Sequence, residues 1–188
     1  MATQAELLAQ DKIYQTQQSV SSTNIHVGTA ASGVTAVERG NDVFHQVTLS
    51  VNTTLGAIAG GAALGLGKKI YDLPAGAVVT GLAYMSVAIT QTQGHINADV
   101  PKVGLGTVIA SGAVSVLSGT ATFQDILAGV SATNCTGTPT LGLTNTPVLK
   151  AAAAARSVYL NVAATWAASG DAAALLTGTV VLDYVFMK

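Results

Sequence analysis

Apolar and polar residues alternate with a period of two along most of the chain from residue 42 onward. In the segment HQVTLSV, the residues Val47, Leu49 and Val51 alternate with polar neighbours. Successive side chains of a β-strand point to opposite faces of the sheet, so this segment is predicted to be a half-buried strand.

The longest alternating segment covers residues 75–92. One face would carry Val79, Ala83, Met85, Val87 and Ile89, and the other Thr80, Leu82, Tyr84, Ser86 and Thr90. Both faces are only moderately polar, so we expect both to be covered. Further strands are predicted at residues 102–110, 113–117, 157–166 and 175–186, and their short, even spacing favours an antiparallel sandwich or barrel over alternating βαβ units.

Breaker residues separate these strands. The LPAG segment at residues 73–76 and SGD at 169–171 are predicted turns, because Pro fixes one dihedral and Gly accepts a positive φ. A single short helical turn is predicted at 122–130, with Thr122 as its cap. The alanine run at 151–155 is predicted to be a strand or a tightly packed loop, and residues 57–67 a connection rich in Gly and Ala.

Residues 1–40 differ from the rest because they are polar and rich in glutamine. Ala5, Leu8, Ala9 and Lys12 could share one face of a short helix. We therefore expect an extended or partly helical N-terminal arm at 1–40, followed by an all-β, antiparallel sandwich domain at 41–188.

Composition adds that the surface is short of charge. Charged residues make up 9% of the 188-residue chain and apolar residues 49%, against roughly 25% charged in an average soluble protein. Such a chain suits an assembly whose surface is covered by partners. The net charge of −1 gives no basic footprint for nucleic acid. The first residues show no secretory signal, so we expect synthesis in a cytoplasm.

Membrane insertion is not favoured either. Residues 43–67, 73–98 and 103–124 are long enough to span a bilayer and poor in charge. Each is diluted with Thr, Ser, Asn, Gln and Gly and alternates along its length, which indicates paired strands rather than a lipid-facing helix.

No motif for catalysis, a cofactor, a metal or a small-molecule substrate survives inspection. The glycine-rich segment fails as a phosphate loop because Lys69 stands where Ser or Thr must ligate magnesium. The three histidines His26, His45 and His95 lack metal-ligand spacing.

The lone Cys135 has no basic neighbours and is interpreted as an inert small residue, and the single Trp166 as a core anchor. The aspartates are too scattered to form an acid–base pair. An enzyme is therefore not expected.

The densest charge cluster is Lys68, Lys69 and Asp72. One interpretation is a solvated strand end with a weak ion pair. The other is an interface contact to an acidic partner surface.

Four short motifs resemble structural proteins that decorate or cement the outside of tailed-bacteriophage heads. They are KIYD at 69–72, the LPAG turn, GLGT at 104–107 and TFQDIL at 122–127. The resemblance covers residues 68–130, and the C-terminal strands match it by general pattern.

The resemblance implies a jelly-roll-like sandwich that trimerises and binds the outside of the icosahedral shell, with the major capsid protein as its partner. Localisation would be the virion surface, and Lys68, Lys69 and Asp72 become a predicted capsid contact. The alternatives are another phage structural subunit (fibre, tail or main shell protein) and a host-surface or carbohydrate-binding β-sandwich.

Overall fold

The computed structural model describes residues 28–41, 43–57, 65–91, 96, 99–112, 116–144, 150–151, 156–163 and 173–186. Its strands are β1 (Thr29–Ala30), β2 (Val34–Gly40), β3 (Phe44–Thr54), β4 (Gly65–Leu73), β5 (Ala77–Thr90), β6 (Lys102–Gly106), β7 (Ser111–Gly112), β8 (Leu127–Ser131), β9 (Thr140–Thr144), β10 (Lys150–Ala151), β11 (Arg156–Ala163) and β12 (Leu175–Phe186). Two single-turn 3₁₀ helices, η1 (Leu117–Gly119) and η2 (Ala121–Phe123), lie between β7 and β8.

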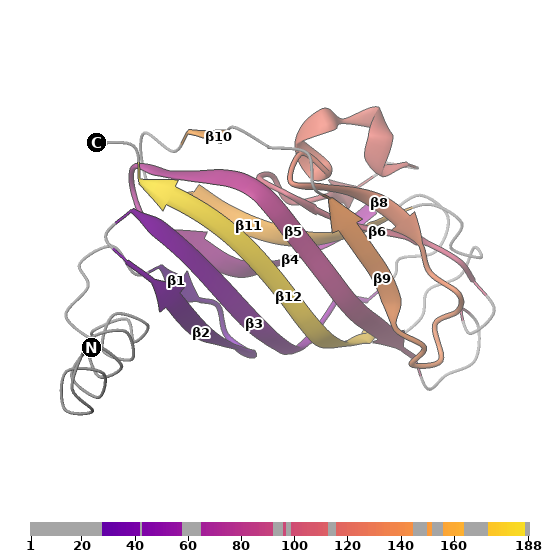
Figure 1. Cartoon of the computed structure of the whole chain (residues 1–188). Helices are drawn as coiled ribbons and strands as arrows, with labels where there is room; N and C mark the ends of the chain where they lie inside the picture. The colour runs from indigo at the N-terminus through magenta and orange to yellow at the C-terminus, as the bar shows by residue number, and fades with distance from the viewer. Residues whose placement is uncertain are drawn as a thin grey trace, which may run out of the picture.

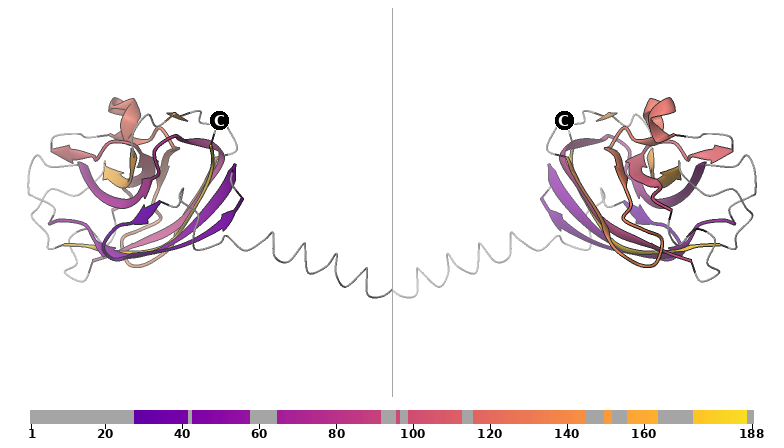
Figure 2. Two further views of the ribbon diagram at one scale, coloured as in Figure 1. Left: turned by 90° about the vertical axis from the view of Figure 1, so that its left-hand side faces the viewer. Right: turned by 90° about the vertical axis from the view of Figure 1, so that its right-hand side faces the viewer.

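The strands form two antiparallel sheets packed face to face (Figures 1 and 2). The first, here called the β4 sheet, has the order β1-β4-β11-β6-β8, with β7 also paired to β4. The second, the β12 sheet, has the order β10-β5-β12-β3-β2, with β9 also paired to β5. Figure 1 looks onto the β12 sheet, and the β4 sheet lies behind it.

The strand order is that of a jelly roll. If β3, β4, β5, β6, β8, β9, β11 and β12 are counted from one to eight, the sheets run 1-8-3-6 and 2-7-4-5. This is the double-sheet, eight-strand arrangement that closes two Greek keys on each other. The prediction of an all-β, antiparallel, jelly-roll-like sandwich is confirmed.

Alternation along the long strands produces the core. In β3, Val47, Leu49 and Val51 are buried, as predicted, and β5 buries the predicted set from Val79 to Ile89. In β12 the buried positions are Leu176, Val180, Leu182, Tyr184 and Phe186. The inner faces of the two sheets meet in one hydrophobic cluster, as in other aligned sandwiches. The predicted turn at 73–76 joins β4 to β5, with Gly76 at φ +83°.

Strand β4 contains a bulge that sequence alternation did not reveal. Lys69 pairs with Tyr159, and Tyr71 pairs with Val158, the residue adjacent to Tyr159 in β11. Ile70 lies between Lys69 and Tyr71 without a partner in β11 and is therefore the inserted residue of the bulge. Both Ile70 and Tyr71 are consequently buried. A bulge reverses the alternation beyond it, so Lys69 and Asp72 share the outer face. The connection predicted at 57–67 overlaps the start of β4, because Gly65, Leu66 and Gly67 already belong to that strand.

The helical turn predicted at 122–130 is wrong. Only residues 121–123 form a 3₁₀ turn, and Leu127–Ser131 is strand β8, paired to β6. Asp125 does not act near a helix N-terminus, because its two carboxylate oxygens accept bonds from the backbone N–H and the hydroxyl of Thr107, at 2.8 and 2.7 Å. This clamp joins two of the motifs noted in the sequence.

The first described residues belong to the sandwich. β1 pairs with β4, and β2 pairs with β3 along seven residues, so both sheets include strands from before residue 41. Residues 1–27 lie outside the described residues, as do Trp166, the turn at 169–171 and residues 113–115 and 152–155. An arm function for residues 1–27 stays a prediction.

Candidate functional site

The two sheets differ in what covers their outer faces. Over β11, the outer face of the β4 sheet is covered by residues 107–112 and 116–126, whose Ala110, Leu117 and Phe123 pack on Ala163 of β11 in a second hydrophobic cluster. Asn161 of β11 fixes this segment. Its Oδ1 accepts the N–H of Ala110 at 2.8 Å, and its Nδ2 donates to the carbonyls of Val108 and Phe123 at 2.8 and 2.9 Å.

The outer face of the β12 sheet, here called the open face, has no such cover among the described residues. It presents the four most exposed large hydrophobic side chains of the described chain: Phe44 at 64%, Leu141 at 62%, Leu143 at 61% and Val37 at 58%. They come from β3, β9 and β2. An exposed apolar surface of this kind usually marks an interaction site.

Cross-strand registers make the open face continuous. Leu143 of β9 lies opposite Tyr84 of β5, Tyr84 opposite Val181 of β12, and the row continues through Thr48 to Val37 of β2. Neighbours directly opposite on one face of a sheet are in side-chain contact range. Among the described side chains facing outward from these strands, two are charged, Arg39 and Asp183.

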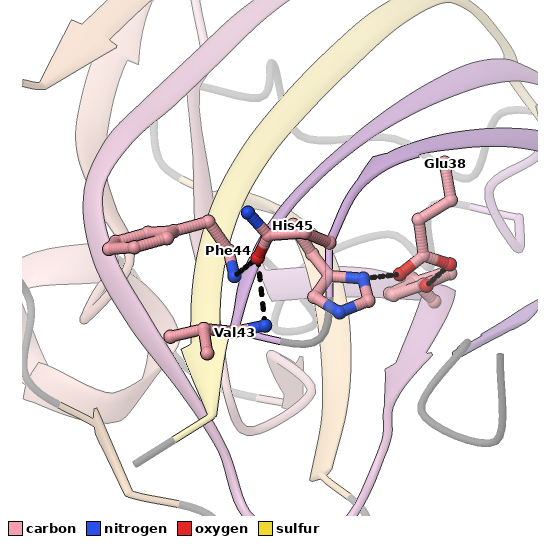
Figure 3. A network of polar contacts seen from close by, with 6 residues as sticks. Glu38, Val43, Phe44 and His45 are labelled. Carbon is pink, nitrogen blue, oxygen red and sulfur yellow. Dashed lines mark hydrogen bonds and ion pairs between the residues drawn. The ribbon is translucent and has the colours of Figure 1, made fainter. Parts of the chain in front are cut away.

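A buried polar network links the two sheets at the side where β2 and β4 approach each other (Figure 3). Glu38 of β2 accepts a hydrogen bond from the Tyr71 hydroxyl of β4 at 3.0 Å. The second oxygen of Glu38 lies 3.2 Å from Nδ1 of His45 on β3. The network ties the sheets together in addition to the apolar core.

Packing holds the members of this network in place. His45 stacks on Tyr184, with ring centroids 4.9 Å apart, and meets Phe186 edge-on at 5.3 Å. Burial is the main cause that raises the pKa of Tyr71, and the charge of Glu38 raises it further. The Tyr71 hydroxyl therefore stays protonated and remains a donor. His45 is the second residue of β3 and is buried.

Tyr71→Phe is expected to lower the free energy of unfolding by about 2 kcal/mol, because it removes a buried hydrogen bond to a charged group. The measurement is urea denaturation followed by circular dichroism. Tyr84→Phe, on the open face, is the matched control and should stay within about 0.5 kcal/mol of wild type. Equal effects of the two substitutions would contradict a link between the sheets.

The predicted contact residues lie on β4 and are only partly brought together. Lys69 Nζ and Asp72 Oδ2 form an ion pair at 2.8 Å on the outer face. Asp72 also accepts a hydrogen bond from the hydroxyl of Ser157, opposite it on β11, at 2.5 Å. Lys68 pairs with the buried Leu160 and so faces the other side of the sheet.

The Lys69–Asp72 pair gives a pH-dependent contribution to stability. Burial acts to raise the pKa of Asp72, but hydrogen bonds from Lys69 and Ser157 and the charge of Lys69 outweigh it, so the pKa lies below its ordinary value of 3.8. A carboxyl group with a lowered pKa stabilises the folded state above the unfolded-state pKa, and this stabilisation is lost as the pH falls through the folded-state pKa.

Asp72→Asn is therefore expected to destabilise the protein slightly at pH 7, and the difference from wild type should vanish well below pH 3.8. Urea midpoints of both proteins measured between pH 7 and pH 2 would show this. A difference that stays constant over that range would contradict the assignment.

Cys135 is buried, and its Sγ lies 3.6 Å from the carbonyl oxygen of Asp99. Burial, followed by the charge of Asp99, raises the pKa of the thiol to about 12. Because the thiolate is the reactive form, this agrees with its interpretation as an inert residue.

His26 and His95 lie outside the described residues. Within the described ranges, no three His, Cys, Asp or Glu side chains gather as metal ligands would. The same part of the chain contains no helix with the length and apolar character needed to cross a membrane.

Comparisons with known proteins do not assign the chain to a family. No family model matches it, and no curated protein matches it. Among solved structures, it is similar to a chain of the cyanophage Pam1 capsid asymmetric unit, with 16% sequence identity and a TM-score of 0.35, over 90% of this chain and 97% of that chain.

Proposed function

We propose that the chain is a virion structural protein that decorates the outside of an icosahedral phage head as a trimer and stabilises the shell. The observation that carries the proposal is the open face: Phe44, Leu141, Leu143 and Val37 are exposed on one side of the sandwich, with few charges between them. A surface of this kind is suited to being covered in an assembly.

The fold is compatible with this role without deciding it. Jelly rolls occur in viral capsid proteins and in lectins, and function has to be argued from the surface rather than from the fold. The low charge of the whole chain, 9%, and the motifs at residues 69–76, 104–107 and 122–127 that resemble head decoration proteins support the virion role. Gly106 and Thr107 of the motif at 104–107 are packed against Phe123 and bonded to Asp125 of the motif at 122–127, so these two motifs form a single structural unit.

The partner would be the major capsid protein. A trimer that grips several shell subunits at once gains avidity, so contacts that are weak individually become effectively permanent. Lys69 and Asp72, together on the outer face, and Lys68, on the other side of the β4 sheet, stay predicted contacts with the head. Lys69 and Asp72 neutralise each other in the free chain, so a shell contact there would use them as hydrogen-bonding groups more than as net charge.

The test is the solution mass of the purified chain by light scattering, repeated after mixing with empty phage heads and pelleting them. A stable trimer that sediments with the heads supports the proposal. A monomer that stays in the supernatant contradicts it, and a screen for glycan or host-surface binding would then follow. A chain that polymerises by itself would favour the fibre, tail or main shell alternatives.

A further inference from the structure

One end of the open face carries a cation and an anion in the same cross-strand row. Arg39 of β2 lies opposite Gln46 of β3, and Gln46 lies opposite Asp183 of β12. Gln46 Nε2 donates to Asp183 Oδ1 at 2.9 Å, which holds that carboxylate in place. Arg39 is exposed and forms no ion pair with a described residue.

A hollow of about 350 Å³ lies over this row, and its lining includes Arg39, Phe44, Gln46, Asp183 and Val185. The Phe44 side chain itself is 64% exposed. A cavity of about 150 Å³ is already large enough to hold a benzene ring. The patch therefore combines an exposed aromatic side chain with a hollow that could receive one.

The turn between β2 and β3 fixes the start of β3, from which Phe44 projects. The side-chain oxygen of Asn41 accepts the backbone N–H groups of Val43 and Phe44 at 2.9 and 2.8 Å (Figure 3). The backbone N–H of Asn41 donates to the Phe44 carbonyl at 2.8 Å. An aromatic group carried on a fixed backbone loses less conformational freedom on binding than one on a loose loop.

We propose that this end of the open face is a contact between copies of the chain, in which Arg39 of one copy pairs with Asp183 of the next and Phe44 enters the neighbouring hollow. A second copy fits better than an acidic or a basic partner, because the patch holds one charge of each sign and has no net charge of its own. Each Arg39 then finds an Asp183 on a neighbouring copy.

The contact between Arg39 and Asp183 is argued from the patch alone. The further step, that three copies close into a ring, rests on the proposed function. A head-to-tail contact closes into a ring when the rotation between copies permits. In a three-copy ring, each copy would supply one Arg39 and one Asp183, and the Phe44 side chains would lie within the contacts.

The test reverses the charges of Arg39 and Asp183 and measures the mass of the assembly in solution. Wild type, Arg39→Glu, Asp183→Arg and the double variant would be compared by light scattering over a range of concentrations, with circular dichroism to confirm that each is folded. Lys102→Glu, an exposed lysine on β6 of the other sheet, is the matched control. The same samples would be sedimented with phage heads.

We expect each single reversal to raise the dissociation constant of the assembly by at least about tenfold. The double variant should recover most of the wild-type association, and Lys102→Glu should leave it unchanged. Folded single variants that keep the wild-type mass would overturn the contact, as would a folded double variant that stays dissociated or a wild-type chain that is monomeric at every concentration.

The sedimentation arm separates this inference from the proposed function. If the reversals leave the mass unchanged while wild type still pellets with heads, the contact is wrong and the decoration role stands. If wild type associates through Arg39 and Asp183 but does not pellet with heads, the contact stands and the decoration role is wrong.

Discussion

Asn161→Ala is expected to lower the free energy of unfolding by about 3 kcal/mol, because it leaves three backbone groups, two of them buried, without their partner. These groups are the N–H of Ala110 and the carbonyls of Val108 and Phe123. Asn161 is completely buried, as are its bonds to Ala110 and Phe123, so water does not replace those two bonds. The side chain also holds residues 107–112 and 116–126 against β11, and its loss should loosen this cover of the β4 sheet.

Urea denaturation measures the stability change, and hydrogen exchange of residues 107–112 and 116–126 measures the loosening. The matched control is Asn52→Ala on β3, an exposed strand asparagine, which should change stability by no more than about 0.5 kcal/mol. If both substitutions cost the same, or if exchange in the covering segment does not speed up, Asn161 does not have this role.

Gly178→Ala should cost about 3 kcal/mol or more, because this position in β12 tolerates no side chain. Its φ is +146°, a backbone region essentially restricted to glycine. A Cβ there would lie 2.1 Å from the carbonyl oxygen of Ser86 on β5. The atom it would strike belongs to the backbone of a neighbouring strand, so relief requires β5 and β12 to separate.

Gly119→Ala provides the control for this substitution. Gly119 lies in η1, and a Cβ there would come no closer than 3.5 Å to the Val116 side chain. Its effect should therefore be small, whereas Gly178→Ala should shift the urea midpoint strongly or prevent folding. A Gly178→Ala protein as stable as the Gly119→Ala protein would contradict the close approach of β5 and β12.

The strands that could be predicted from the sequence are those whose alternation is unbroken. β3, β5, β11 and β12 each place apolar residues inward at every second position, and these formed the predicted strands. The spacing predicted an antiparallel sandwich or barrel, and the resemblance implied its jelly-roll-like form, but the strand order was not predicted. In each case the core requirement and the local pattern agree, which is the condition under which sequence specifies structure.

The elements that were missed break that pattern for identifiable reasons. In β4, the bulge at Ile70 puts two consecutive residues into the core, so a strict period of two disappears. β8 and β9 are five residues long and contain glycine, and they become strands through their pairing with β6 and β5. The spacing in residues 122–130 resembles one helical turn, but tertiary pairing overrides local propensity.

The apolar, charge-poor character of the candidate site could be predicted from the sequence, but its position in the fold could not. The low charge indicated a covered surface, but the sequence could not say which sheet would be covered by the chain itself. That depends on Asn161, an outward-facing strand residue whose partners lie 38 to 53 positions away. Arg39 and Asp183 meet in one row only through the pairing of β2, β3 and β12.

The difference between the outer faces of the two sheets supports the proposed role. Residues 107–112 and 116–126 cover the β4 sheet over β11 with the chain's own apolar side chains, whereas the β12 sheet keeps Phe44, Val37, Leu141 and Leu143 exposed. Among the described residues, a sandwich partly covered on one side and open on the other has a defined surface for other molecules. We infer that assembly, rather than folding, covers that surface.

The most direct test of the virion role is electron cryomicroscopy of isolated phage heads, before and after addition of the purified protein. The account predicts additional density with the shape of the sandwich on the outside of the shell, grouped in threes, with the open face buried. Shells without added density, or density for this chain within the shell lattice itself, would contradict it.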